Sequence, residues 1–383
     1  MSRPTIVFCG GGSGGHLSPA IAIMQQLQRL LPDFTAVVFC SDRPVDRRML
    51  ELAASRIPEL AWHPLVSIPR GPFPKRQLQG LFEILRVRQW LIRRFRQQQP
   101  AVVVGLGAFA SIPGILAARR LAIPTVLLEA NTIPGRATRQ LASLADCLFT
   151  GLPLADSMQA KLRIRMEHSG VPVRSEVAGI ARESLPPGGS RRTLLVIGGS
   201  QGAANLNSLV QQAFGDGCLL PGDWRILHQT GVADRAALTD FYLKSRLPAD
   251  VVEFLPDLPR LLREAGLAVS RAGAVSLAEL ACAGVPSILI PLSTAADGHQ
   301  RGNAEYLAST GAAVVVDETA GTAAGAMQLG RQIREISHSE SRLTQMAIAA
   351  RDAARPDAAK IIAEFLQRIV SPSAVATPRG TSS

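Results

Sequence analysis

The chain has 383 residues, of which 47% are hydrophobic, 19% charged and only 4% aromatic, and its formal net charge is +11. At roughly 100–200 residues per domain, this length predicts two domains that each bury a core of their own. Five widely spaced cysteines without a C-x-x-C pair argue against a disulfide framework and against a cysteine zinc site, and the scarcity of aromatic residues argues against a nucleic-acid partner.

The first predicted strand, residues 5–9, leads directly into the glycine-rich turn GGGSGGH at residues 10–16. Because no apolar leader precedes this strand, we expect the protein to stay on the cytoplasmic side of the membrane. A strand that ends in glycines before a helix lets backbone N–H groups and the positive end of the helix approach a phosphate closely. The turn therefore predicts a nucleotide-binding α/β domain.

Two interpretations of this turn stay open. Its G-x-G-x-x-G spacing, with Asp42 after the next strand, fits the dinucleotide site of an oxidoreductase. His16, however, follows the last glycine at the start of the helix, where a neutral imidazole is favoured over its cation and suits a general base. A histidine merely placed at the edge of the loop is the alternative to that role.

Further strands in the first half are predicted near residues 36–40, 101–104, 125–129 and 146–149. They alternate with helical stretches, a pattern typical of a parallel sheet with helices on both faces. The uncharged run at residues 100–118 is almost long enough for a membrane span. Its internal glycines, Ser111 and Pro113 instead predict a strand, a loop and a helix.

The positive charge is concentrated in the first half of the chain. Residues 1–180 contain 22 basic and 11 acidic residues, whereas the remainder contains 19 of each. Within residues 70–96, eight basic residues accompany the single acid Glu83, and apolar residues at positions 78, 81, 82, 85, 92 and 95 fit one helical stripe. Such a helix suits the surface of an anionic membrane. A helix packed on the core with a solvated arginine face is the alternative.

Proline- and glycine-rich segments separate the predicted domains. Residues 170–192 contain GVPVR and PPGGSRR and are predicted to connect a first domain, residues 1–175, to a second, residues 176–370. The helical run at 341–368 is interrupted by Pro356, so we expect a bent last helix that crosses back onto the first domain. Residues 371–383 lack apolar periodicity and are predicted to form a disordered tail.

Strands of the second half are predicted near residues 193–197, 225–228, 251–254, 267–269, 287–290 and 313–316. The first of them ends in a second glycine-rich turn, GGSQGA, in which Ser200 and Gln201 offer a hydroxyl and an amide to phosphate oxygens. Ser200 is alternatively an ordinary helix N-cap. Two glycine turns about 190 residues apart predict two similar nucleotide folds.

Two other segments of the second half carry polar chemistry. Gly273 and Ala274 open a helix in which Glu279 lies about one turn further on, where its carboxylate can accept hydrogen bonds from ribose hydroxyls. Glu279 alternatively complements only the helix dipole. After the strand near 287–290, the segment ADGHQRGNAEYL places polar side chains at the carboxyl edge of a parallel sheet, where ligands bind and sugar hydroxyls can be read.

Six segments, in order, resemble the MurG family of peptidoglycan N-acetylglucosaminyltransferases: GGGSGGHLSPAIAI, EANTIPG, GGSQGAANLN, EFLPDL, SRAGAVSLAEL and DGHQRGNA. The resemblance runs from residue 10 to about residue 307. It implies a GT-B fold, in which two Rossmann-like doubly wound domains face each other across a cleft. It also implies inverting transfer of GlcNAc from UDP-GlcNAc to undecaprenyl-pyrophosphoryl-MurNAc-pentapeptide, by a peripheral protein at the cytoplasmic face of the plasma or inner membrane, with residues 70–96 on the anionic surface.

The resemblance assigns a role to each matching residue. His16 is the candidate base, and the phosphates, the sugar, the uracil and the ribose each have their own contacts. Those contacts are Ser13, Gly14 and Gly15 near the donor diphosphate and acceptor pyrophosphate; Asn131 and Gln300 at the GlcNAc; Ser200, with Gln201 beside it, at the diphosphate; Leu255 at the uracil through its backbone; Ala274, Val275, Ser276 and Leu277 at the α-phosphate; Glu279 at the ribose; and Arg174, which matches an arginine of the family's G-N-P-V-R segment.

Some segments depart from the family pattern. GVPVR lacks the usual asparagine, Gly107-Ala108-Phe109 stands where G-G-Y is frequent, and Leu128-Glu129-Ala130-Asn131 stands where H-E-Q-N is frequent. The chain contains no D-x-D motif to hold a diphosphate through a metal, so we expect helix N-termini and Arg174 to stabilise the leaving group, with a loosely bound Mg²⁺ as the alternative. We expect no cofactor. Two alternative functions have the same fold but a different reaction: a UDP-GlcNAc epimerase, and a transferase that acts on another lipid.

Overall fold

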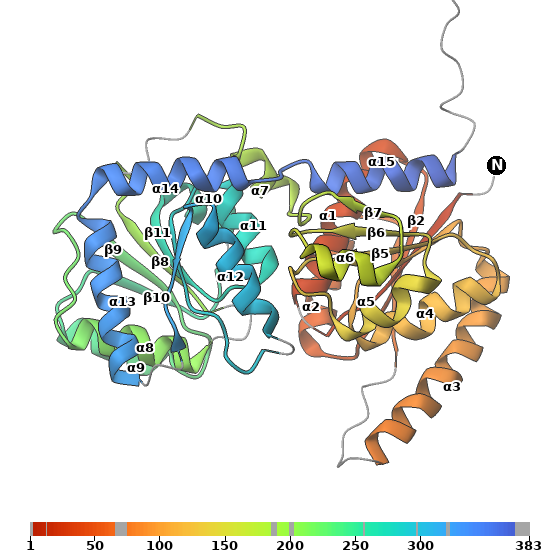
Figure 1. Ribbon diagram of the computed structural model, residues 1–383, viewed down its shortest axis with the longest axis horizontal. Helices are drawn as coiled ribbons and strands as arrows, with labels where there is room; N and C mark the ends of the chain where they lie inside the picture. The colour runs from red at the N-terminus through yellow and green to blue at the C-terminus, as the bar shows by residue number, and fades with distance from the viewer. Residues whose placement is uncertain are drawn as a thin grey trace, which may run out of the picture.

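The structure is a computed structural model. It describes residues 3–12, 14–65, 75–184, 190–198, 203–255, 257–295, 298–318 and 322–371. Two α/β domains lie side by side, the first drawn in red to yellow and the second in green to blue (Figure 1). Each is built on one parallel sheet with helices on both faces, and a large cleft has walls from both. The predicted fold class is confirmed.

The first sheet has seven parallel strands in the order β3-β2-β1-β4-β5-β6-β7. They are β1 (Thr5–Cys9), β2 (Thr35–Cys40), β3 (Leu60–Pro64), β4 (Val102–Gly105), β5 (Thr125–Glu129), β6 (Cys147–Thr150) and β7 (Met166–His168). The helices are α1 (Gly14–Leu30), α2 (Pro44–Ala54), α3 (Lys75–Gln98), α4 (Ala108–Arg120), α5 (Arg136–Leu141) and α6 (Asp156–Leu162), with a 3₁₀ turn at Ala142–Leu144. The next helix, α7 (Ser175–Ile180), packs in the core of the second domain. The five predicted strands are confirmed. β3 and β7, which were not predicted, are the edge strands, and their partly exposed side chains give no continuous apolar run.

The second sheet has six parallel strands in the order β10-β9-β8-β11-β12-β13. They are β8 (Thr193–Ile197), β9 (Arg225–Gln229), β10 (Ala249–Val252), β11 (Ala265–Ser270), β12 (Ser287–Leu289) and β13 (Ala313–Val315). The helices are α8 (Ala204–Gly215), α9 (Arg235–Lys244), α10 (Leu258–Glu264), α11 (Ala274–Cys282), α12 (His299–Ser309), α13 (Thr322–Ser337), α14 (Glu340–Ala353) and α15 (Ala358–Val370). All six predicted strands are present, with β10 starting two residues early. In both sheets the order reverses beside the first strand, and this switch point is where doubly wound sheets bind ligands.

The apolar run at residues 100–118 forms β4 and most of α4, as the sequence predicts; β4 is buried in the first domain, and α4 buries one face there. Alternate residues of β1 serve different cores: Ile6 and Phe8 face one side of the sheet, and Val7 and Cys9 the other. Because both faces are covered, the strand is apolar throughout rather than alternating. Among the helices that the structure describes, none has the length and apolar character needed to cross a membrane.

The chain crosses between the domains twice. α14 covers the second domain and ends at Ala353, and α15 then runs over the first domain, as expected from Pro356 (Figure 1). Ile362 and Leu366 of α15 belong to the same core as Leu17 of α1. The two crossing segments contact each other at Gly170 of the first and Arg355 of the second. A Cβ on Gly170 (φ +90°) would lie only 2.3 Å from the Cβ of Arg355, so only glycine fits at this position.

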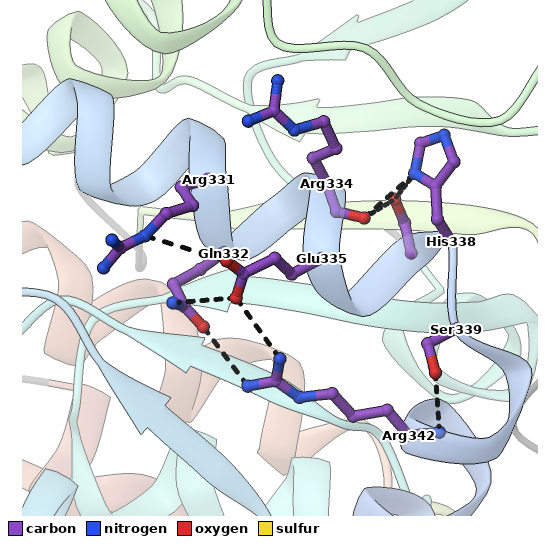
Figure 2. Close-up of polar contacts among 8 residues, drawn as sticks. Arg331, Gln332, Arg334, Glu335, His338, Ser339 and Arg342 are labelled. Atoms are coloured by element: carbon purple, nitrogen blue, oxygen red, sulfur yellow. Dashed lines mark hydrogen bonds and ion pairs between the residues drawn. The ribbon is translucent and has the colours of Figure 1, made fainter.

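Local polar contacts form the corner between α13 and α14 (Figure 2). Ser339 caps α14 by accepting a hydrogen bond from the backbone N–H of Arg342 at 3.2 Å. The guanidinium of Arg342 reaches back to Glu335 at 3.4 Å, and Nδ1 of His338 lies 2.9 Å from the carbonyl oxygen of Arg334. These contacts orient α14, and α14 in turn directs the chain into the second crossing.

Helix α3 differs from the single apolar stripe that its sequence predicts. Near its carboxyl end, Leu91, Ile92 and Phe95 are buried in the core of the first domain. Further back, Phe82 is 71% exposed and Leu85 is 47% exposed, and the helix extends away from the domain (Figure 1). The stripe splits because the helix is longer than the domain face that it covers. Residues 70–74, and the side chains of 75–79 and Leu81, lie outside what the structure describes.

Candidate active site between the two sheets

A cleft of about 1610 Å³ lies between the two domains. The loops after β1, β4 and β5 form one wall, and the loops after β8, β11 and β12 form the other. Both switch points thus open into one cavity, which is large enough for a substrate of several rings. Among the predicted site residues, the cleft is lined by Gly14, Gly15, His16, Asn131, Ala274, Val275, Ser276 and Gln300.

His16 lies in the first turn of α1, and its ring rests against Gly107, the residue that precedes α4. A Cβ on Gly107 would lie 3.4 Å from Cδ2 and 3.5 Å from Nε2 of the ring, which is ordinary contact, so the positive φ of +83° rather than space favours glycine here. Burial is the main cause that lowers the pKa of His16, and nearby His299 lowers it further, whereas Glu129 and Asp46 oppose the shift. The imidazole is therefore neutral near pH 7 and able to accept a proton.

Asp46 holds the first glycine turn. Its Oδ2 accepts hydrogen bonds from the backbone N–H of Gly12 at 2.6 Å and from the hydroxyl of Ser41 at 2.5 Å. Gly11 (φ +145°) passes so close that a Cβ there would lie 2.6 Å from the same oxygen. Asp46 is buried, and its position in the first turn of α2 suggests by sequence only an acid that complements the helix dipole. Its role in the turn was not predicted for that reason.

Glu129 organises the loop after β5. Its Oε1 accepts from the backbone and side-chain nitrogens of Asn131 at 3.1 and 3.0 Å. Its Oε2 accepts from the backbone N–H of Gly135 at 2.9 Å and from the hydroxyl of Thr138 at 2.7 Å. A buried carboxylate with four donors is fully satisfied, so loop 130–135 has a fixed shape.

The opposite wall presents the N-terminus of α11. Gly273 caps the helix, and Ala274, Val275 and Ser276 line the cleft in its first turn. The first N–H groups of a helix have no partner within the helix and carry partial positive charge, which attracts anions. Leu277 belongs to the same turn, but its side chain is buried in the core.

Arg174 and Glu279, which the sequence assigns to different ligand groups, form an ion pair with each other. Nη2 of Arg174, just before α7, lies 3.0 Å from Oε1 of Glu279 on α11. Burial raises the pKa of Glu279, and Arg174 opposes that shift. Neither residue lines the cleft, although Glu279 lies less than one turn beyond Ser276.

Leu255 is buried in the second domain, next to Phe254, whose ring is half exposed. The guanidinium of Arg48 on α2 lies 5.4 Å from the centre of the Phe254 ring, a contact between the two domains. Gln300 lines the cleft and accepts a hydrogen bond from the backbone N–H of Leu292 at 3.0 Å. Ser13, Ser200 and Gln201 lie outside the described residues.

Arg271, which follows β11 directly, lines the cleft and was not among the predicted site residues. It forms a partly buried ion pair with Glu318 at 2.6 Å, and Glu318 also accepts from the side chain of Asn205 at 2.7 Å. Asn205 lies in the first turn of α8, so Glu318 joins the segments that follow β8 and β11. The position of Arg271 at the end of a central strand was the signal that could have found it.

Relatives of this chain are known. Residues 6–150 match the glycosyltransferase family 28 N-terminal domain and residues 193–362 its C-terminal domain. A protein of Zymomonas mobilis named UDP-N-acetylglucosamine--N-acetylmuramyl-(pentapeptide) pyrophosphoryl-undecaprenol N-acetylglucosamine transferase is 33% identical over 95% of this chain and 92% of its own. A protein of the same name from Dechloromonas aromatica is 35% identical over 96% and 99%. The chain belongs to the MurG family.

The structural comparison agrees with this assignment. The crystal structure of Acinetobacter baumannii MurG matches with a TM-score of 0.73 and 25% identity, over 96% of this chain and 100% of that one. A putative UDP-N-acetylglucosamine 2-epimerase from Listeria monocytogenes, 15% identical with a TM-score of 0.63, shares the fold. As a MurG family member, the chain is a glycosyltransferase with the GT-B architecture.

Proposed function

We propose that this protein transfers GlcNAc from UDP-GlcNAc to lipid-linked N-acetylmuramyl-pentapeptide, with inversion, in peptidoglycan synthesis. One observation carries the proposal. A neutral histidine on one wall of the cleft faces the anion-attracting N-terminus of α11 on the other wall. These are the two groups that a sugar transfer from a nucleotide needs, and the names of the relatives supply the substrates.

The proposed reaction is a single displacement. The hydroxyl of the acceptor sugar attacks the anomeric carbon of GlcNAc while His16 takes its proton. The bond between the anomeric carbon and the diphosphate oxygen breaks, and the electron pair leaves with UDP. The N–H groups at Ala274–Ser276 stabilise the negative charge that develops on the diphosphate. Attack from the face opposite the leaving group inverts the anomeric centre.

The remaining predicted residues take the donor contacts in this proposal. Gly14 and Gly15, with Ser13, lie near the phosphates of both substrates; Ser200, Gln201 and the backbone of Leu277 contact the donor diphosphate; Leu255 contacts the uracil; and Asn131 and Gln300 contact the GlcNAc. Glu279 accepts from the ribose hydroxyls, and its ion pair with Arg174 opposes the rise in the pKa of the carboxyl that burial causes. Arg174 then approaches the leaving diphosphate only if it exchanges partners.

We further propose that α3 attaches the protein to the anionic, cytoplasmic surface of the membrane. Phe82 and Leu85 are exposed apolar side chains, and Arg86, Arg88 and Arg93 lie on the same helix. Gly80 and Ile84 of α3 line the cleft itself. A helix that meets the membrane on one side and the cleft on another brings a lipid-linked acceptor to His16.

The decisive experiment is transfer of labelled GlcNAc from UDP-GlcNAc to lipid-linked muramyl-pentapeptide. Labelled disaccharide on the lipid, with the inverted anomer, supports the proposal. A thermal-shift titration provides the second measurement: UDP and UDP-GlcNAc should stabilise the protein, whereas NADH and NADPH should not. Stabilisation by the nicotinamide nucleotides instead, without transfer, would favour the oxidoreductase.

A further inference from the structure

Asn303, on α12 of the second domain, is completely buried at the boundary with the first domain. Its side-chain nitrogen donates to Oδ1 of Asn131 at 2.9 Å and to the carbonyl oxygen of Ala272 at 3.1 Å. Its side-chain oxygen accepts from the backbone N–H of Thr132 at 3.0 Å and from the Thr132 hydroxyl at 3.3 Å. One amide thus connects two loops of different domains with four hydrogen bonds.

The chemistry of the partners fixes the orientation of both amides. The carbonyl of Ala272 can only accept and the N–H of Thr132 can only donate, so the nitrogen and oxygen of Asn303 cannot exchange places. The carboxylate of Glu129 can likewise only accept, so it faces the nitrogen of Asn131 and leaves the oxygen of Asn131 for Asn303. Asn131 is held from both ends, by Glu129 of its own domain and Asn303 of the other.

Close packing accompanies these hydrogen bonds. A Cβ on Gly302 would lie 2.5 Å from Oγ1 of Thr132, so the loop approaches α12 more closely than any other residue would allow. Beside this contact, Leu152 and Val171 of the first domain form a small apolar cluster with Ala274 of the second. The domains are therefore fitted together at this place.

We propose that Gly302 and Asn303 form a latch that receives Asn131 and Thr132, and that Asn303 is a positioning residue acting through Asn131. The latch keeps the two walls in register and sets the Asn131 amide at one orientation in the cleft. The side-chain nitrogen of Asn131 keeps one further N–H, and its oxygen keeps one further lone pair. Both can bind a sugar hydroxyl. This last step rests on the proposed function, because it takes the donor sugar as the ligand of Asn131.

Hydrogen exchange of the protein without substrate tests the latch itself. In Asn303→Ala, the peptide that contains residues 131–135 should exchange at least tenfold faster than in the wild type, because the N–H of Thr132 loses its acceptor. Glu305→Ala, an exposed change on the same helix, is the matched control and should leave this peptide unchanged. Unchanged exchange in folded Asn303→Ala would overturn the latch, whatever reaction the enzyme catalyses.

A rescue pair covers the case in which Asn303→Ala does not fold. Gly302→Ala introduces the methyl group that meets Oγ1 of Thr132, and should accelerate exchange of the same peptide although alanine favours a helix. Thr132→Ala removes that oxygen, so the double variant Gly302→Ala/Thr132→Ala should restore part of the protection lost in Gly302→Ala. Equal exchange in Gly302→Ala and its rescue would contradict close packing at the latch.

Ligand affinities test the positioning role. Asn303→Ala should weaken UDP-GlcNAc binding about tenfold and change UDP binding less than twofold, because only the sugar meets Asn131. The double variant Asn131→Ala/Asn303→Ala should bind UDP-GlcNAc no more weakly than Asn131→Ala alone. Additive losses would mean that Asn303 contacts the ligand itself and would overturn the positioning role. Wild-type protein that binds neither nucleotide would refute the proposed function and leave the exchange result standing.

Discussion

The two domains build opposite walls of the cleft from sheets with similar strand order, but they use different βα turns: the first domain uses the turn after β1, and the second uses the turn after β11. In the first domain, the carboxylates of Asp46 and Glu129 hold the loops around His16 and oppose the lowering of its pKa. Near the opposite wall, Arg174 pairs with Glu279 and Arg271 pairs with Glu318, and the first turn of α11 between them lines the cleft. In the proposed reaction, one wall thus supplies the base and the other supplies the anion site, and the two walls differ in the charges that surround each turn.

The largest expected effect is the loss of the base. His16→Ala should lower the rate of GlcNAc transfer by about 10² to 10⁴-fold, because the attacking hydroxyl loses its proton acceptor. UDP-GlcNAc binding should remain, since the donor wall is untouched. Steady-state kinetics and calorimetry on the same preparation measure both, with His338→Ala on the second domain as the control. If His16→Ala transferred GlcNAc at the wild-type rate, His16 would not be the base, and the two walls would not differ in the way described.

The pH profile follows from the pKa of His16. Because burial lowers that pKa below the ordinary histidine value of 6.5, the acidic limb of kcat/KM should lie below pH 6.5. Asp46→Asn removes a carboxylate that raises the pKa, so it should move the limb to lower pH and also loosen the glycine turn. A limb that moves to higher pH in this variant would contradict the electrostatic role of Asp46.

The ion pair between Arg271 and Glu318 behind the second wall should have the next largest effect. Glu318→Ala leaves the largely enclosed Arg271 guanidinium without its carboxylate, which should cost up to about 3 kcal/mol of unfolding free energy. Urea unfolding, followed by Trp224 in a variant with Trp62 and Trp90 replaced by phenylalanine, reports on the second domain alone. Lys244→Ala breaks an exposed pair with Asp240 and should cost less than about 1 kcal/mol. Equal losses of unfolding free energy in Glu318→Ala and Lys244→Ala would mean that the pair of Arg271 and Glu318 stabilises the domain no more than an exposed pair does.

A buried histidine should make the second domain sensitive to acid. His228 bonds to Tyr242 at 2.9 Å and Asn207 at 3.1 Å, and burial lowers its pKa to about 4 from 6.5. The unfolded chain takes up a proton near pH 6.5 and the folded chain only near pH 4, so stability is lost as the pH falls through this window. The shift corresponds to about 3 kcal/mol. Urea midpoints of wild type and His228→Gln, taken from pH 7 to 4, should converge in acid, and parallel curves would rule out His228 as the cause.

The smallest expected effect concerns the membrane contact of the first domain. Phe82→Ser with Leu85→Ser should weaken binding to anionic vesicles about tenfold, because two exposed apolar side chains no longer enter the interface. The matched control is Leu243→Ser, an equally exposed apolar residue on the second domain. Sedimentation with vesicles of phosphatidylglycerol measures both variants. Equal losses of vesicle binding in the two variants would mean that α3 is not the specific membrane contact.

Local patterns account for what could be predicted of the fold. Apolar runs bounded by glycine and proline predicted the central strands, and Pro356 predicted the break between α14 and α15. The same reasoning missed β3 and β7, because an edge strand is half exposed and carries a mixed sequence. It also merged Phe82 with Phe95 into one stripe, since the periodicity of a helix does not tell where the supporting domain ends.

By itself, the sequence determined two glycine turns at two strand ends, a histidine at the start of one helix and a positive first half, because each depends on residues close together in the chain. The tertiary structure alone decided the partners. Arg174 meets Glu279 across 105 residues, and Asn131 meets Asn303 across 172. A carboxylate or an amide can accept or donate in many places, so its role is settled only when folding brings one partner within hydrogen-bonding distance and excludes water from the rest.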